Sequence, residues 1–272
     1  MKPLNTELLE EHHAFIKSDN PWQQRARLLQ ALWREKQGLP IGDHRGNPLG
    51  SRLAMPYAKD TLANYLTETI RDAVRAEVLG TAAKGKLFAE PRIWNDLLSS
   101  QPLCFNLFGE LQADLDLAQR TLGQMGVDAD VVTRVTFEHS PGRSDSRFLD
   151  DKSAFDVFVE YETKGQKAFL GIEVKYHENL ANSPGKHRER YSEVAEAMGC
   201  FSQSAEAELQ KKPLQQIWRD HLLAGSLVLA DVGYDHGTFV FLYPAANECC
   251  ASALIDYQGH LTNSDTFVSV RQ

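Results

Sequence analysis

The stretch SAFDVFVEYETKGQKAFLGIEVKYH, residues 153–177, decides the fold of this chain. It contains two runs rich in β-branched and aromatic residues, a composition typical of β-strands, and a Lys164-Gly165 pair separates them. A two-residue turn that ends in glycine between two such runs predicts a β-hairpin. The rest of the predicted structure is built outward from this hairpin.

The turn sets the register of the two strands. If Lys164-Gly165 is the turn, Thr163 pairs with Gln166. Each residue before Thr163 then pairs with the residue that lies equally far after Gln166. Counting in this way places Asp156 directly opposite Glu173. Side chains alternate between the two faces of a strand, so Lys175 lies on the same face as Glu173. One face therefore gathers two carboxylates and one ammonium.

Two carboxylates that face each other on paired strands have Cβ atoms about 5 Å apart and repel each other. A divalent cation between Asp156 and Glu173 would remove this penalty, and Mg²⁺ prefers oxygen ligands of this kind. Lys175 could stabilise the negative charge that develops during phosphate-ester cleavage, or position the attacking water. The alternative explanation is a solvated ion-pair cluster on an exposed sheet face.

The flanking sequence predicts a mixed α/β fold. Strand-like runs occur at DVVTRVTFEH (130–139) and TFVFLYP (238–244), on either side of the hairpin. Helical spacing of apolar residues predicts helices over about 22–37, 57–80, 92–126, 187–210 and 213–224. The segment 38–51 is rich in turn residues, with four glycines and two prolines. The order helix, three strands, helices, strand predicts a mixed sheet flanked by helices.

Composition bounds the setting of the protein. The chain has 272 residues, 42% of them hydrophobic, which is enough for one large domain or one domain with an added subdomain. The net charge of −8 argues against a protein that coats nucleic acid non-specifically, but not against a local basic cleft. No apolar run is long enough for a secretion signal or a membrane span. We therefore expect a cytoplasmic protein with no membrane partner, and the four cysteines look reduced and mostly buried.

The pattern FD (155–156), sixteen residues, then EVK (173–175) resembles the PD-(D/E)XK motif of the restriction-endonuclease-like nucleases. Phe155 stands where the motif name has proline. The segment LLSSQPLCFNLFGEL (97–111) also resembles a bacterial branch of that superfamily. The resemblance implies an αβββαβ core over residues 97–245 and Mg²⁺-dependent cleavage of DNA, with Mn²⁺ as the other candidate ion. It implies Asp156 and Glu173 as metal ligands and Lys175 as the catalytic lysine.

Other residues are candidates for supporting roles. Many members of the superfamily carry another acid on the helix before the first strand, and Glu110 is the best candidate here, ahead of Glu90 and Asp114. The remaining candidates are His177 as a base or phosphate donor, Gln216 and Arg219 on one face of a later helix, and a basic cluster for a substrate phosphate, namely Lys186, His187, Arg188 and Arg190. For each of them, a plain surface position is the alternative explanation.

We therefore expect a restriction-endonuclease-like α/β domain over residues 96–272 and an N-terminal helical region over residues 1–95 packed on it. The expected function is that of a metal-dependent deoxyribonuclease, with RNA as the alternative substrate and a homodimer as one expected assembly. A rival hypothesis from another class is an inactive module that keeps the nuclease fold and binds nucleic acid or a protein partner. Binding of a divalent cation would favour the enzyme.

Overall fold

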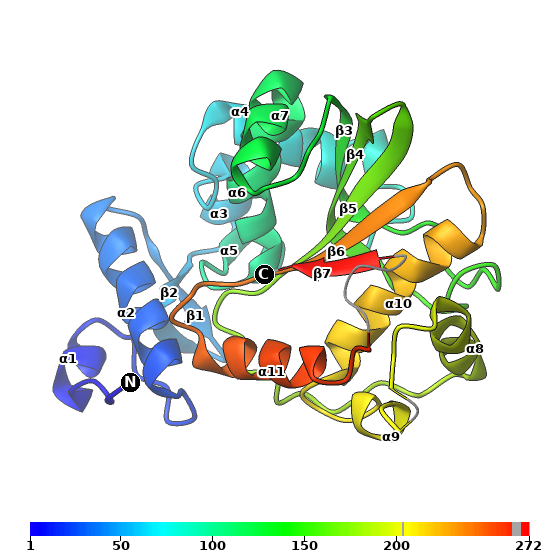
Figure 1. The fold of residues 1–272 in the computed structure, drawn as a ribbon. Coiled ribbons are helices and arrows are strands. Elements are labelled where there is room, and N and C mark those ends of the chain that lie inside the picture. The colour runs from blue at the N-terminus through cyan, green and yellow to red at the C-terminus, as the bar shows by residue number, and fades with distance from the viewer. Residues whose placement is uncertain (203, 263–267, 272) are drawn as a thin grey trace. The chain divides into compact units, whose positions relative to one another are not determined.

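A computed structural model describes residues 1–202, 204–262 and 268–271 of the chain (Figure 1). The chain forms two compact units. The N-terminal unit comprises Met1–Gly109, Tyr176–Glu178 and Pro244–Glu248, and the sheet unit comprises Glu110–Lys175, Asn179–Tyr243 and Cys249–Gln272. The domain boundary predicted at residue 95 falls inside the N-terminal unit. It stays a prediction, because compactness alone does not show which part folds independently.

The sheet unit holds the predicted hairpin and the elements around it. Its strands are β3 (Val131–His139), β4 (Phe155–Thr163), β5 (Gln166–Val174), β6 (His236–Leu242) and β7 (Val268–Arg271). Its helices are α7 (Leu115–Gln124), α8 (Glu189–Met198), α9 (Glu206–Leu209), α10 (Gln215–Leu229) and α11 (Glu248–Gln258), and α6 (Ser100–Ala113) enters it from the N-terminal unit.

The five strands form one sheet in the order β3-β4-β5-β6-β7 (Figure 1). Strands β3, β4 and β5 pair antiparallel, whereas β5 with β6 and β6 with β7 pair parallel. The predicted mixed α/β sheet flanked by helices is thus confirmed, and all four predicted strands are present. Strand β7 was not predicted from the sequence and adds a parallel edge next to β6.

The β4-β5 hairpin has the predicted register. Lys164 and Gly165 both have positive φ angles, 51° and 77°, as the two central residues of a type I′ turn require. The ladder runs without a shift from the pair Thr163 and Gln166 to the pair Val157 and Ile172. Asp156 is the next residue along β4 and Glu173 is the next along β5, one step beyond the last pair of the ladder.

Helix α10 covers one face of the sheet and is buried for most of its length. It packs against β5 and β6, and also against α8. A Cβ atom on Gly225 would lie 2.2 Å from Sδ of Met198, so a glycine at this point lets α8 and α10 approach closely. The shared core contains large apolar side chains from the sheet and from α10, among them Phe158, Phe169 and Trp218.

The single helix predicted over 187–210 is wrong, because two shorter helices occupy this segment. Helix α8 ends at Gly199, whose φ of 64° is the left-handed conformation that closes many helices. Helix α9 begins only at Glu206 and has four residues. The helical spacing of apolar residues across 187–210 therefore did not reveal the stop at Gly199.

The N-terminal unit is mostly helical and contains one β-hairpin. Its elements are α1 (Thr6–Glu11), α2 (Pro21–Lys36), β1 (Ile41–His44), β2 (Asn47–Leu53), α3 (Tyr57–Thr61), α4 (Glu68–Val74), the π-helix η1 (Arg75–Leu79), the 3₁₀-helix η2 (Thr81–Ala83) and α5 (Arg92–Asn95). The turn-rich segment 38–51 thus forms most of a two-stranded antiparallel hairpin within the region expected to be helical.

The helix predicted over 57–80 is also interrupted. Helix α3 ends at Leu62, which has a positive φ of 52°, and α4 starts anew at Thr67. The Thr67 side chain accepts a hydrogen bond from the backbone nitrogen of Ile70, at 3.2 Å, as an N-cap does. Apolar spacing alone did not reveal this second start, because Thr67 reads equally well as an interior residue.

Candidate active site

Asp156, Glu173 and Lys175 lie at the same end of the β4-β5 hairpin. The backbone nitrogen of Val174 donates a hydrogen bond of 2.8 Å to Oδ2 of Asp156, which ties the Asp156 side chain to β5. Lys175 follows the last residue of β5, and its backbone nitrogen donates to the carbonyl oxygen of Leu242 at 2.8 Å. Strand pairing on both sides of β5 therefore holds the backbone that carries these side chains.

Glu173 is the centre of a buried polar cluster. Glu173 and Lys175 are each only 6% exposed. Oε1 of Glu173 accepts a hydrogen bond from the Lys175 ammonium and a second one, of 2.6 Å, from Nε2 of Gln216. Burial at this level contradicts the alternative of a solvated ion-pair cluster on an exposed face. A buried carboxylate needs such partners to offset the loss of water.

The pKa of Asp156 is raised well above its ordinary value. Burial is the main cause, because it disfavours the charged form, and the negative charge of Glu173 raises the pKa further. The positive charge of Lys175 and the hydrogen bond from the backbone of Val174 act in the opposite direction without cancelling the effect. The charge of Glu173 thus disfavours ionisation of Asp156.

Helix α10 brings Gln216 into hydrogen-bond contact with Glu173. A supporting role for Gln216 stays a prediction. The neighbouring Arg219 has its Nε 3.9 Å from Oδ1 of Asp220. Burial lowers the pKa of Arg219, but the negative charges of Asp220 and of further acidic groups together outweigh burial and leave the pKa raised. Arg219 stays charged within this cluster.

Sequence reasoning missed Asp220. Its side chain is buried, at 2% exposure, and its pKa is raised well above the ordinary value by burial and by the negative charge of Glu173. A usable signal was present, because Asp220 follows Gln216 by four residues and thus lies on the same helix face. Asp220 therefore joins Asp156 and Glu173 as a third carboxyl group on which the charge of Lys175 acts.

The three acids proposed for the helix before the first strand have different surroundings. Asp114 caps α7, since its Oδ1 accepts a hydrogen bond of 2.8 Å from the backbone nitrogen of Leu117. Glu90 lies in the N-terminal unit and binds Nε1 of Trp94 at 3.1 Å. Glu110 lies on α6 and is partly exposed, within the sheet unit. The capping and tryptophan contacts give Asp114 and Glu90 structural roles, which leaves Glu110 as the remaining prediction.

His177 does not share a strand face with Lys175, because β5 ends at Val174. It belongs to the N-terminal unit, where its Nδ1 lies 2.9 Å from the carbonyl oxygen of Leu98. Its own carbonyl oxygen accepts a hydrogen bond of 3.0 Å from Nε2 of Gln23. His177 therefore lies beyond the strand and contacts the N-terminal unit, and its role as a base stays a prediction.

The residues of the predicted basic cluster differ in how far their side chains already bind other protein groups. Arg190 donates to the carbonyl oxygens of Phe148 and Arg147, at 2.8 and 3.1 Å, and thereby fastens the loop before β4. Arg188 lies 3.4 Å from a carboxylate oxygen of Asp150. Lys186 is exposed. Binding of phosphate by Lys186 and Arg188 stays a prediction, whereas the Arg190 guanidinium is committed to protein acceptors.

The donor set of the cluster suits a hard divalent cation. Asp156 and Glu173 supply carboxylate oxygens, and Mg²⁺ is often held by one or two carboxylates together with waters and substrate oxygens. Burial, and after it the negative charge of Glu173, raises the pKa of Asp156, and a bound cation would favour its charged form. Within residues 1–202, 204–262 and 268–271, no group of three or more His, Cys, Asp and Glu side chains converges as a ready-made metal ligand set.

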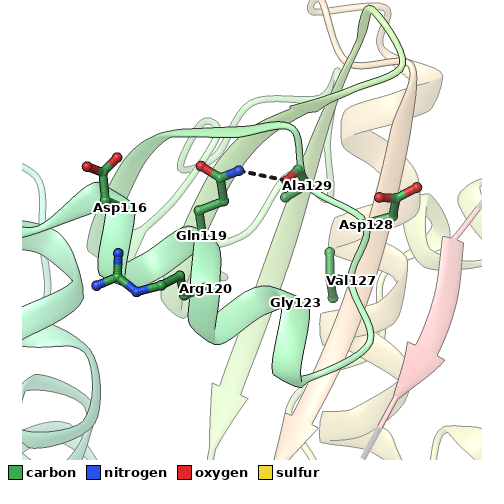
Figure 2. A pocket seen from close by; sticks show the side chains of 7 residues that line it. All are labelled: Asp116, Gln119, Arg120, Gly123, Val127, Asp128 and Ala129. Atoms are coloured by element: carbon green, nitrogen blue, oxygen red, sulfur yellow. Dashed lines mark hydrogen bonds between the residues drawn. The ribbon is translucent and has the colours of Figure 1, made fainter.

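A separate hollow of about 440 Å³ lies between α7 and the loop that leads to β3 (Figure 2). Gln119 lines this hollow, and its Nε2 donates to the carbonyl oxygens of Ala129 and Asp130, at 3.2 and 2.7 Å. The lining residues are Asp116, Gln119, Arg120, Gly123, Val127, Asp128 and Ala129. None of them belongs to the cluster around Glu173, so this hollow is not the candidate active site.

The arrangement of a hairpin acid, an E-x-K on the next strand and a parallel strand beyond it defines a nuclease-like fold. The family model of the PD-(D/E)XK nuclease superfamily matches residues 17–272, and the chain belongs to that superfamily. No curated protein and no solved structure matches the chain significantly. In the described part of the chain, no helix is long and apolar enough to cross a membrane. The predicted restriction-endonuclease-like fold is thus confirmed.

Proposed function

We propose that the protein is a nuclease that hydrolyses phosphodiester bonds with the help of a divalent cation. The observation that carries this proposal is the placement of Asp156, Glu173 and Lys175 at one end of the hairpin, within a buried cluster that Gln216 completes. Membership of the superfamily supports the reaction class. The same residues form the motif that the sequence contains.

In this proposal Asp156 and Glu173 would hold Mg²⁺ or Mn²⁺ through their carboxylate oxygens. A bound cation supplies Lewis acidity and lowers the pKa of a water molecule. Gln216 orients the Glu173 carboxylate through its hydrogen bond of 2.6 Å. The Lys175 ammonium provides a positive charge that can stabilise negative charge on a cleaved phosphate or hold the attacking water.

We propose DNA as the substrate and treat RNA as the alternative. The net charge of −8 disfavours long non-specific coating of nucleic acid, so binding would depend on local cations. Arg219 in the cluster, together with Lys186 and Arg188 on the loop ahead of α8, are the proposed local cations. Contacts of such residues to phosphate position a nucleic acid without reading its sequence.

The test is a cleavage assay on supercoiled plasmid, linear duplex, and single-stranded DNA and RNA oligonucleotides, with Mg²⁺, Mn²⁺ or EDTA. The Glu173→Gln protein should be inactive on every substrate that the wild type cleaves. A matched control is Glu208→Gln, which makes the same change at a side chain that is 57% exposed on α9. Equal cleavage by Glu173→Gln and wild type would refute the proposed site. Binding of nucleic acid without cleavage in any metal would favour the inactive module.

A further inference from the structure

The Lys175 ammonium is hydrogen-bonded to one carboxylate of the sheet unit, and its charge acts on two further acids. It donates a hydrogen bond to Oε1 of Glu173. Its positive charge also acts on Asp156 and on Asp220, since it lowers the pKa of each against the larger effect of burial. Glu173 is a hydrogen-bond partner of the ammonium, and Asp156 and Asp220 are within the influence of its charge.

Asp220 has an unused acceptor in this cluster. The residue is only 2% exposed, and its Oδ2 is buried without a hydrogen-bond partner among the residues that the structure describes. Its Oδ1 is 3.9 Å from Nε of Arg219, too far for a hydrogen bond. A buried carboxylate oxygen without a donor is costly, and such groups in folded proteins are uncommon.

Helix geometry places Asp220 on the face of α10 that meets Glu173. Gln216 and Asp220 are four residues apart on α10, so they lie on one face, a single turn from each other. Nε2 of Gln216 donates to Oε1 of Glu173, which fixes that face of α10 against the end of β5. The negative charge of Glu173 is, after burial, the largest influence on the pKa of Asp220.

A divalent cation and the Lys175 ammonium are both positively charged and compete for the Glu173 carboxylate. Lys175 already occupies Oε1 of Glu173, and an ammonium has no lone pair with which to share a cation. We infer that Asp220 is a positioning residue that receives the Lys175 ammonium when a divalent cation occupies Glu173. This inference rests on the proposed function, and it assigns a partner for Lys175 in the loaded site.

The competing explanation is that Asp220 is a further ligand of the cation or a remote negative charge. The two explanations differ in their dependence on Lys175. A ligand or a remote charge would favour the cation whether or not Lys175 is present. An acceptor for the displaced ammonium would matter only while the ammonium exists.

The experiment is a double-mutant cycle on the full chain. Mn²⁺ affinity is measured by calorimetry for wild type, Asp220→Asn, Lys175→Met and the double variant. In the wild-type background, Asp220→Asn should weaken Mn²⁺ binding about tenfold, because the ammonium then stays on Glu173. In the Lys175→Met background, the same change should alter the affinity less than about twofold. The control is Asp256→Asn, where the side chain is 62% exposed on α11 and the affinity should not change.

Equal weakening by Asp220→Asn in both backgrounds, or none in either, would overturn the inference and leave the proposed function intact. Absence of Mn²⁺ and Mg²⁺ binding by the wild type would overturn both. Because Asp220 is buried and its variant could fold poorly, a crystal structure of the wild type with Mn²⁺ serves as a second measurement. Nζ of Lys175 should then lie within hydrogen-bond distance of a carboxylate oxygen of Asp220, and an ammonium still bound to Glu173 would refute the inference.

Discussion

Lys175→Met should separate the structural effect of the ammonium from its effect on cleavage. Methionine keeps an unbranched stem of similar length, so the substitution removes mainly the charge and its hydrogen bond to Glu173. In metal-free buffer it leaves Glu173 buried with Gln216 as its remaining described side-chain donor. Removing one partner of a buried ion pair costs about 3–5 kcal/mol in the free energy of unfolding.

The lower end of that range applies here, because the Gln216 hydrogen bond survives. A loss of about 3 kcal/mol would lower the melting temperature by about 5–10 °C in a protein of this size. Mg²⁺ or Mn²⁺ should restore part of the loss, since a cation replaces the missing positive charge and binds only the folded chain. Cleavage should fall about a hundredfold, equivalent to ~3 kcal/mol of transition-state stabilisation.

The assays are thermal unfolding in EDTA and in Mg²⁺, calorimetry of the ion, and plasmid cleavage. The matched control is Lys211→Met, because Lys211 is 61% exposed and its pair with Glu208, at 2.7 Å, is a solvated one on the surface. Such an exposed pair contributes little to stability, so the control should melt and cleave like the wild type. A Lys175→Met protein that cleaves normally, or melts like the control in EDTA, would refute the reasoning.

Three further outcomes can be measured. Glu173→Gln should weaken Mn²⁺ binding at least about tenfold by calorimetry. Its melting temperature in EDTA should fall less below the wild-type value than the melting temperature of Lys175→Met does. Because the pKa of Asp156 is raised, the folded chain holds a proton that the unfolded chain releases. The contribution of Asp156 to stability in EDTA should therefore fall as pH rises above the ordinary pKa of 3.8. Asp156→Asn should flatten this dependence of the melting temperature on pH. Gly171→Ala should destabilise the fold by about 1–3 kcal/mol in urea unfolding, because its Cβ would lie 2.4 Å from the Phe155 ring, whereas Gly123→Ala, with no atom within 4 Å, should not.

The sequence was sufficient for the hairpin and the motif because both depend on local chemistry. A Lys164-Gly165 turn with two positive φ angles sets the register of the strands that it joins, and the register places Asp156 across from Glu173. Alternation along a strand then assigns Lys175 to the same face as Glu173. None of these steps requires knowledge of distant parts of the chain.

The ends of the helices were harder to predict from the sequence. The apolar spacing across 57–80 and across 187–210 is compatible with uninterrupted helices, yet Leu62 and Gly199 adopt left-handed conformations that end them. The choice between continuing and stopping depends on small free-energy differences, and tertiary packing outweighs them.

Burial of the site was decided by tertiary structure. The pairing of β4 and β5 does not show whether their charged face meets solvent or another element, and α10 lies more than forty residues further along the chain. Packing of α10 against β5 brings Gln216 to Glu173 and buries Asp220 beside it. Burial in turn raises the pKa of Asp156 and of Asp220, because desolvation penalises charge according to the surrounding atoms and not according to the local sequence.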